Sequence, residues 1–201
     1  MGTLYTWGRG SDGQLGHDFR CPVRSENCAL PHPVKELLTR KVVHVACGGG
    51  QQGCTGAVTD SGKLFVFGNN YGGRLGFLGE HVGTPREVPG VPLLRSVAFG
   101  SRHGIAVSHD GDAWSWGTGL GVGRAGSMFC APAALQIKGK VTSVDAEHKW
   151  SAVVLDAGEL LTFGSNEYGK LGVGKSSTEL THRVCPTQIS GGSSMERRSA
   201  E

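Results

Sequence analysis

The sequence lacks the features of a membrane protein and of a secreted disulfide scaffold. No apolar run approaches the roughly 18 residues that a membrane-spanning helix requires. The 6 cysteines include no C-x-x-C pair, so we expect mostly reduced thiols and a cytoplasmic or nuclear location. The net charge of +3 is too small to imply a nucleic-acid or membrane surface, and we expect neither as a partner.

The residues of common catalytic centres are also not arranged as those centres require. The glycine-rich stretch CGGGQQG, at 47–53, lacks the Lys-Ser/Thr pair and the following helix of a phosphate-binding P-loop. No Ser-His-Asp set and no pair of carboxylates has a recognisable spacing. We therefore predict no covalent catalysis, no catalytic residues and no cofactor, and leave nucleotide-exchange activity open.

One segment contains both histidines and cysteines. Two of each can hold zinc in a tetrahedral site. Here neither pair has the close spacing of the common zinc motifs, and the segment joins two sequence repeats, where such residues can simply be solvated. We predict no metal, and the only candidate ligands are His17, Cys21, Cys28 and His32.

Glycine, in contrast, is abundant, at 34 of 201 residues. There is no G-X-Y period, which excludes collagen. Glycines between β-branched and aromatic runs indicate short strands joined by tight turns. One such run recurs and ends each time in an aromatic residue and a glycine: GTLYTWG at 2–8, GKLFVFG at 62–68, GDAWSWG at 111–117 and GELLTFG at 158–164.

Each of these runs is the second half of a longer repeat. The last three are preceded by a V-x-x-V-like segment, a small-residue loop and a second apolar run, which together predict a hairpin leading into the aromatic strand. Pro-x-x-apolar segments lie further upstream and suit an edge position, where the missing N–H of proline is tolerated. The aromatics at the recurring strand position are predicted core residues: Trp7, Phe67, Trp116 and Phe163.

The repeats predict an all-β protein made of four-stranded blades over residues 1–189. The Ser/Gly-rich tail at 190–201 is expected to be disordered. The predicted organisation is a half-unit at 2–16, units at 31–76, 85–123 and 132–172, and the start of a further unit at 186–189.

This repeat resembles that of the regulator of chromosome condensation (RCC1-like) repeat family. The likeness lies in the succession V-x-x-V, G-x-x-H, an apolar run, D-G-x-apolar-x-x-W-G and G-Q-L-G, best seen in VAFGSRHGIAVSHDGDAWSWG at 97–117. The family closes about seven blades of about fifty residues into a β-propeller. The resemblance therefore implies an incomplete propeller of about three and a half blades. We expect a fragment or short isoform of a longer propeller, or a second chain that completes it.

The resemblance also implies where a partner would bind. In this family the loop around G-x-x-H opens on the partner-binding face, and members that catalyse nucleotide exchange place a histidine and acidic residues there. The histidine position corresponds here to Cys54, His103 and Trp150, and the two residues before each of them are not acidic. This difference favours an acidic protein surface or phosphate groups as the ligand. The predicted partner-binding residues are Gln51, Gln52, Arg102, His103, His148, Lys149 and Trp150.

Two of these residues have a structural alternative. His103 could bond backbone carbonyls and fix its turn, and Trp150 could either anchor a partner or fill the space of an absent histidine. The whole sequence predicts a non-enzymatic protein interaction or scaffold module that binds a protein partner. The alternatives are a guanine nucleotide exchange factor, or a fragment of one, for a Ras-like small GTPase, and a structural subunit of a large assembly.

Overall fold

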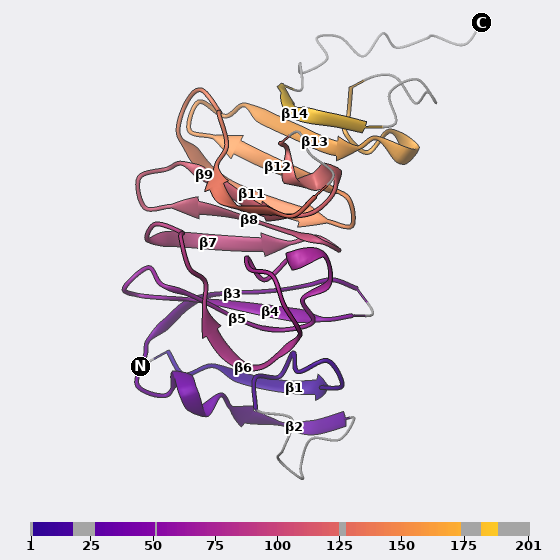
Figure 1. Ribbon diagram of the computed structural model, residues 1–201. Coiled ribbons are helices and arrows are strands. Elements are labelled where there is room, and N and C mark those ends of the chain that lie inside the picture. The colour runs from indigo at the N-terminus through magenta and orange to yellow at the C-terminus, as the bar shows by residue number, and fades with distance from the viewer. Residues whose placement is uncertain (1, 18–26, 51, 125–127, 174–181, 189–201) are drawn as a thin grey trace, which may run out of the picture.

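The protein forms four antiparallel β-sheets that are stacked in one direction (Figure 1). The computed structural model describes residues 2–17, 27–50, 52–124, 128–173 and 182–188, with only the backbone of Asn27 and of the last range. The strands are β1 (Tyr5–Arg9), β2 (Asn27–Pro33), β3 (Val42–Gly48), β4 (Cys54–Thr59), β5 (Leu64–Gly68), β6 (Val82–Glu87), β7 (Leu94–Phe99), β8 (His103–Ser108), β9 (Ala113–Gly117), β10 (Cys130–Ala134), β11 (Val141–Glu147), β12 (Trp150–Leu155), β13 (Leu160–Ser165) and β14 (His182–Gln188).

Helical structure in the described residues is limited to short 3-10 turns. They are η1 (Lys35–Leu37), η2 (Tyr71–Gly73), η3 (Leu120–Val122) and η4 (Glu167–Gly169). None of the helices in this part of the chain has the length and apolar character needed to cross a membrane. The predicted all-β class is confirmed, with 48% of the structure in strands and 8% helical.

Three of the sheets are complete blades of four strands. The first blade is β3-β4-β5-β6, the second is β7-β8-β9-β10 and the third is β11-β12-β13-β14. The remaining sheet has two strands, β1-β2, and we call it the half-blade. The chain is therefore a partial propeller, as the repeats predict.

The sheets divide the chain differently from the predicted units. Each Pro-x-x-apolar segment begins in the outermost strand of its sheet, and that strand pairs with the preceding aromatic strand, as β6 pairs with β5. Likewise β14, which contains residues 186–188, pairs with β13 and completes the third blade instead of starting another. The reason is that an outermost strand tolerates the missing N–H of proline, so this segment closes a sheet. The tail at 190–201 lies outside the described residues.

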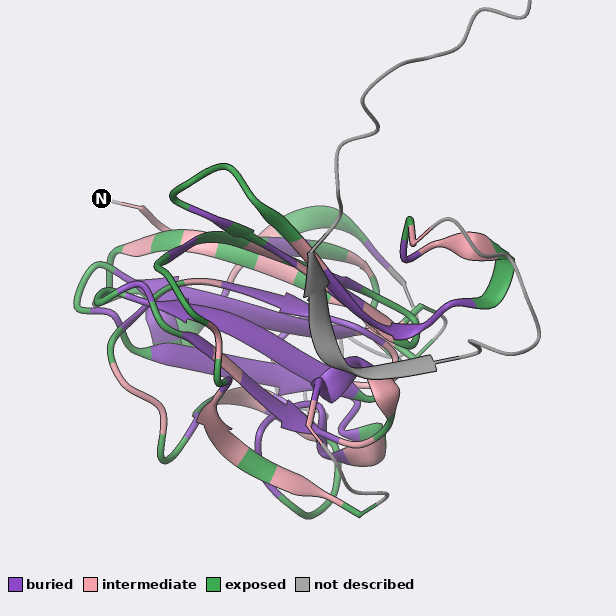
Figure 2. Cartoon of the chain, turned by 90° about the horizontal axis from the view of Figure 1, so that it is seen from above, coloured by how far each residue is buried: buried purple, intermediate pink, exposed green. Residues whose placement is uncertain are grey.

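The core lies between successive sheets. Strand β5 shows why, because its side chains alternate between two buried faces. Phe65 and Phe67 pack toward the half-blade, whereas Leu64 and Val66 pack toward the second blade. Seen along the stack, buried residues occupy the central strands and exposed residues lie mostly in the loops around them (Figure 2).

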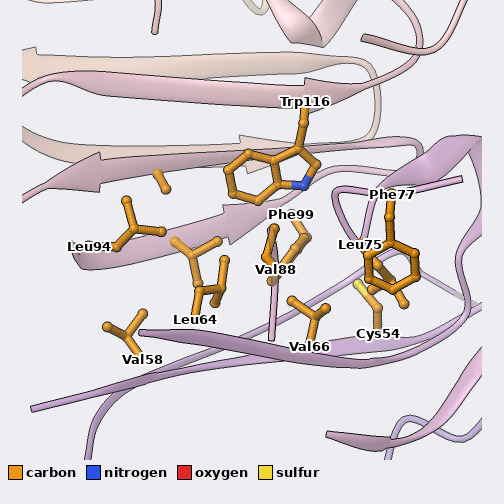
Figure 3. Packing of buried hydrophobic residues seen from close by; sticks show 12 residues of the cluster. Cys54, Val58, Leu64, Val66, Leu75, Phe77, Val88, Leu94, Phe99 and Trp116 are labelled. Carbon is orange, nitrogen blue, oxygen red and sulfur yellow. The ribbon is translucent and has the colours of Figure 1, made fainter. Parts of the chain in front are cut away.

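The best-filled of these interfaces joins the first and second blades. The Trp116 ring of β9 lies over Leu64, Val66 and Val88 of the first blade (Figure 3). A corresponding layer between the second and third blades contains Phe163 of β13. Each blade thus contributes a large aromatic that is buried against the blade before it.

A hydrogen bond accompanies each aromatic contact. In each interface, one backbone carbonyl in the loop that follows the aromatic strand accepts a hydrogen bond from the next blade. In two interfaces the donor is a hydroxyl: Thr55 Oγ1 bonds the Gln14 carbonyl at 2.9 Å, and Ser151 Oγ bonds the Gly121 carbonyl at 2.9 Å. In the third, Trp116 Nε1 donates to the Arg74 carbonyl at 2.7 Å.

The core prediction for the aromatics is confirmed for three of them and wrong for Trp7. Phe67, Trp116 and Phe163 have 0% exposure, but Trp7 is 60% exposed. The physical reason is directional: each buried ring packs on the preceding sheet, and the described structure places no sheet before the half-blade. Trp7 therefore occupies a core position of the repeat without the surface that would bury it.

Gly104 pairs with Trp116 in the second blade, and Ser151 pairs with Phe163 at the same positions of the third blade. We predict that serine and phenylalanine together can replace the Gly104–Trp116 pair. A Cβ on Gly104 would lie 2.4 Å from the Trp116 ring, so Gly104→Ser alone should be destabilising. Trp116→Phe leaves the buried Arg74 carbonyl without its donor and should cost about 1–3 kcal/mol. The double variant restores a hydroxyl donor beside a phenylalanine.

Denaturant unfolding of wild type, both single variants and the double variant measures the coupling between the two sites. We expect the double variant to be at least about 1 kcal/mol more stable than the two single effects added together. Simple additivity would contradict this account of the interface.

Candidate interaction surface

Two loops of each blade meet at one end of the strands. The first residue of β4, Cys54, pairs with Gly68 at the end of β5, and His103 and Trp150 pair with Gly117 and Gly164 in the same way. The loop before each of these strands and the loop after its partner must therefore be neighbours. We call this surface, on the right in Figure 1, the loop face; its described residues are 49–50, 52–53, 69–75, 100–102, 118–123, 147–149 and 166–171.

Arg102 and Tyr71 form an exposed pair on the loop face. Arg102 follows β7 in the second blade, and Tyr71 follows β5 in the first. The guanidinium lies 4.5 Å from the centroid of the Tyr71 ring and donates a hydrogen bond to the phenolic oxygen at 2.8 Å. This stacking holds the charge of Arg102 at the surface between two blades.

The turn between β11 and β12 presents His148 and Lys149 to solvent. His148 has a φ of 48°, a left-handed conformation that is uncommon for residues other than glycine. The Glu147 carboxylate accepts a hydrogen bond from the His148 backbone N–H at 2.9 Å, which holds the turn. Trp150, the next residue after Lys149, is half-buried at the start of β12.

Tyr168 is a feature of the loop face that the sequence prediction missed. It has a φ of 63° and is 93% exposed, so its ring contributes almost nothing to the core. The equivalent residue of the first blade is Gly72, which has a φ of 69°. Comparing NYGGRLG with NEYGKLG would have shown a tyrosine in a glycine position. Among the described residues only His148 and Tyr168 combine a side chain with positive φ, and both belong to the loop face of the third blade.

His103, in contrast, is inside the protein and cannot reach a partner. Its exposure is 1%, and its Nε2 lies 2.7 Å from Ser151 Oγ. Because Ser151 Oγ donates to the Gly121 carbonyl, the imidazole must donate to Ser151. Burial lowers the pKa of His103 to about 4, which keeps the ring neutral near pH 7. The structural alternative for His103 therefore fits its surroundings.

A buried arginine holds the loops of the first blade. The guanidinium of Arg74 donates to the carbonyls of Asn69 and Ser101 at 2.7 and 3.0 Å, to Asn69 Oδ1 at 2.6 Å, and to the Gln52 carbonyl. Burial lowers the pKa of Arg74, and it raises the pKa of the neighbouring Cys54 thiol to about 12. Arg74 thus fixes the backbone of three loops from within, two in the first blade and one in the second.

The remaining predicted residues give no further site. Gln52 is exposed on the loop face, and Gln51 lies outside the described residues. Of the candidate zinc ligands, Cys21 also lies outside, while Cys28 is buried with its Sγ 3.1 Å from the Leu30 carbonyl. The other two candidates, His17 and His32, are in ring contact, with centroids 6.2 Å apart. In the described part of the chain no three His, Cys, Asp or Glu residues are placed to hold a metal.

A cavity of about 720 Å³ adjoins the half-blade. Its walls include β1, the end of β3 with the following glycine loop, and Asp145 and Glu147 of β11. On its second edge β1 pairs with no strand of the described residues. The cavity is therefore the inner region of a blade that has only its two outer strands here.

Stacked four-stranded sheets with paired loops at one end define a β-propeller type of repeat protein. The family model for the regulator of chromosome condensation (RCC1) repeat matches residues 1–54, 61–107 and 157–199. The chain belongs to this family.

Several curated proteins are similar to this chain in sequence. It is 34% identical to human E3 ubiquitin-protein ligase HERC2 over 91% of the chain and 4% of the relative. It is 32% identical to Ultraviolet-B receptor UVR8 of Arabidopsis thaliana over 94% of the chain and 44% of the receptor. It is 32% identical to the bovine secretion-regulating guanine nucleotide exchange factor over 85% of the chain and 38% of that protein. The chain thus spans less than half the length of these relatives.

Solved structures confirm the fold. Human WBSCR16 superimposes with a TM-score of 0.78 at 23% identity, covering 94% of this chain and 49% of that one. Yeast RCC1 (Prp20), in a structure bound to Kap60, has a TM-score of 0.76 at 25% identity, covering 94% and 45%. Saccharomyces cerevisiae Prp20p, whose binding to Gsp1p and histones has been characterised, gives the same TM-score and identity over 94% and 47%.

The neutral, buried state of His103 predicts a pH dependence of stability. Because its folded pKa of about 4 lies below the ordinary value of about 6.5, the unfolded chain binds a proton that the folded chain does not. This contribution to stability is complete above about pH 6.5 and is lost as the pH falls toward about 4. The loss should reach up to about 3 kcal/mol.

Urea unfolding of wild type and His103→Gln at several pH values between these limits measures that loss. The variant should be less stable than wild type at neutral pH and should depend less steeply on pH. His148→Gln, which removes an exposed histidine, is the matched control and should keep the wild-type slope. Equal slopes for wild type and His103→Gln would contradict the assignment.

Proposed function

We propose that the chain is a protein interaction module that binds its partner through the loop face of the second and third blades. The observation that carries this proposal is Tyr168, an aromatic side chain in a left-handed conformation with 93% exposure. A tyrosine in that conformation costs about 1 kcal/mol or more relative to glycine. The fold gains nothing in return from an exposed ring, and residues held in such conformations cluster at functional sites.

The neighbouring side chains supply the anchors that a protein interface uses. Tyrosine, tryptophan and arginine are the residues most often found at the energetic centre of such interfaces. The loop face offers Tyr168, half-buried Trp150 and the Arg102–Tyr71 pair. Arg74 and His103 hold the supporting loops rigid, so little conformational entropy is lost on binding.

The charges of this surface favour an acidic partner. Exposed Arg102 and Lys149 stand on the two blades, and half-buried Lys170 lies in another loop of the third blade. Exposed acidic residues of the same loops are Glu147, which bonds the His148 backbone N–H, and Glu167. Complementary charge would raise the association rate with an acidic protein surface and make it sensitive to salt.

The comparisons support protein binding as the general role. Family members act in protein interaction and as guanine nucleotide exchange factors, and a related yeast structure shows one of them bound to Kap60. Since this chain spans less than half of the length of its relatives, the proposal covers protein binding in general and not their particular partners.

A second candidate is nucleotide exchange on a small GTPase. The similarity to a secretion-regulating guanine nucleotide exchange factor favours it. Exchange needs only contacts that displace the bound nucleotide, so it would require no covalent chemistry. Against it, the family's histidine position holds a buried imidazole in the second blade, and other residue types in the first and third: Cys54 and Trp150.

Tyr168→Gly should separate binding from stability. Glycine accepts the left-handed conformation freely, so the free energy of unfolding should stay unchanged or rise by up to about 1 kcal/mol. Partner binding should weaken by about tenfold or more, as expected when an aromatic anchor is removed. The matched control is Asp156→Ser, an exposed change in the turn at the opposite end of the same blade.

The measurement is quantitative mass spectrometry of proteins that co-purify with each variant, followed by calorimetry with the recovered protein. A partner that binds Tyr168→Gly and wild type equally would contradict the role given to this surface. Loss of stability in Tyr168→Gly would contradict the strain argument.

Release of a labelled guanine nucleotide from a panel of small GTPases tests the second candidate. We expect no acceleration by the chain. Acceleration that is abolished by Arg102→Glu but kept in Asp156→Ser would promote nucleotide exchange to the first function.

A further inference from the structure

Two sheet faces at opposite ends of the stack are apolar and uncovered by any described sheet. The first open face belongs to the half-blade and presents Tyr5 and Trp7, which are 50% and 60% exposed. The last open face belongs to the third blade and presents Val154 and Leu160, 36% and 38% exposed, next to half-buried Trp150. Exposed large hydrophobic groups clustered on one face mark a contact surface.

Inside the chain, the equivalents of both faces are packed against each other. Phe65 and Phe67 stand in the first blade where Tyr5 and Trp7 stand in the half-blade, and both are buried. Val58 and Leu64 stand where Val154 and Leu160 stand, and they lie beneath the next blade with its Trp116 (Figure 3). The first open face therefore corresponds to the sheet face that packs on the preceding blade in the internal interfaces. The last open face corresponds to the sheet face that is covered there.

The hydrogen bond of the internal interfaces also has a counterpart at each end of the stack: an acceptor carbonyl at one end and an N–H donor at the other. The Arg74 carbonyl accepts from Trp116 Nε1, and its equivalent in the third blade, the Lys170 carbonyl, has no hydrogen bond to any described residue. At the other end, the described half-blade has no strand that could supply a hydroxyl donor as Thr55 or Ser151 does. It does have Trp7, at the position of Trp116, and of the four equivalent aromatics only these two carry an N–H donor.

We propose that the chain associates head to tail with a second copy of itself, the half-blade of one copy covering the third blade of the other. Trp7 of one copy packs on Val154 and Leu160 of the next, and its Nε1 donates to the Lys170 carbonyl. This surface adjoins the loop face at Trp150 and Lys170, but its apolar contacts lie on the sheet faces and do not depend on the function proposed above. A head-to-tail contact leaves one face free at each end, so it forms a ring or extends.

Sedimentation velocity of the full chain over a wide concentration range tests the proposal. Wild type should form species larger than a monomer as concentration rises. Trp7→Ser and Val154→Lys should each remain monomeric, because each loses one of the two faces. Trp7→Phe keeps the apolar ring but not the donor, and should weaken association by up to about tenfold, the value of one hydrogen bond.

An equimolar mixture of Trp7→Ser and Val154→Lys provides the sharper test. Each variant keeps the face that the other has lost, so the mixture should form a dimer that grows no further. If Trp7 instead met Trp7 across a two-fold axis, Val154→Lys would associate by itself, and that result would overturn the head-to-tail arrangement.

Circular dichroism and thermal unfolding establish that each variant is folded. Should Trp7→Ser fail to fold, the monomeric state of Val154→Lys and the weakened self-association of Trp7→Phe still test the two faces separately. Wild type that stays monomeric at all concentrations would overturn the proposal. Tyr168→Gly should associate as wild type does, so a failure of the loop-face function and a failure of self-association give different results.

Discussion

The structure depends on one contact that recurs between successive sheets. A large aromatic ring of one blade is buried on the aliphatic face of the blade before it, and a donor from the same blade bonds a loop carbonyl of that neighbour. The ring supplies buried apolar area, and the hydrogen bond fixes how far one sheet slides over the next. Because the carbonyl belongs to the loop after the aromatic strand, the same contact also fixes the loops that form the loop face.

This arrangement separates the residues that hold the loops from those that face solvent. Arg74 and His103 are charged or polar types, yet both are buried and their hydrogen bonds end on backbone carbonyls, on Asn69 Oδ1 or on Ser151. Tyr168, His148 and Lys149 make no comparable internal contacts and lie outside. Residue type alone would favour the first group as binding residues, whereas only the second group is exposed.

The sequence predicted the blades well because their signal is local and repeated. The period-2 pattern and the turn glycines of GKLFVFG and GDAWSWG identify strands whatever surrounds them. It did not predict the exposure of Trp7, because burial of that position depends on a neighbouring sheet and not on the strand itself. It also placed residues 186–188 in a new unit, since a proline at an edge fits the start of a unit as well as its end. For the surface, the histidine signature pointed to the buried His103, while the departure from glycine at Tyr168 was overlooked.

The four tryptophans allow the interface model to be tested in one measurement. Solvent exchange of the indole N–H protons, followed by NMR in dilute solution, reports whether each indole is hydrogen-bonded and buried. We expect the Trp116 N–H to be strongly protected by the Arg74 carbonyl, and the Trp7 N–H to exchange freely. Rapid exchange at Trp116, or protection at Trp7 in the dilute monomer, would contradict the contact on which this account of the fold rests.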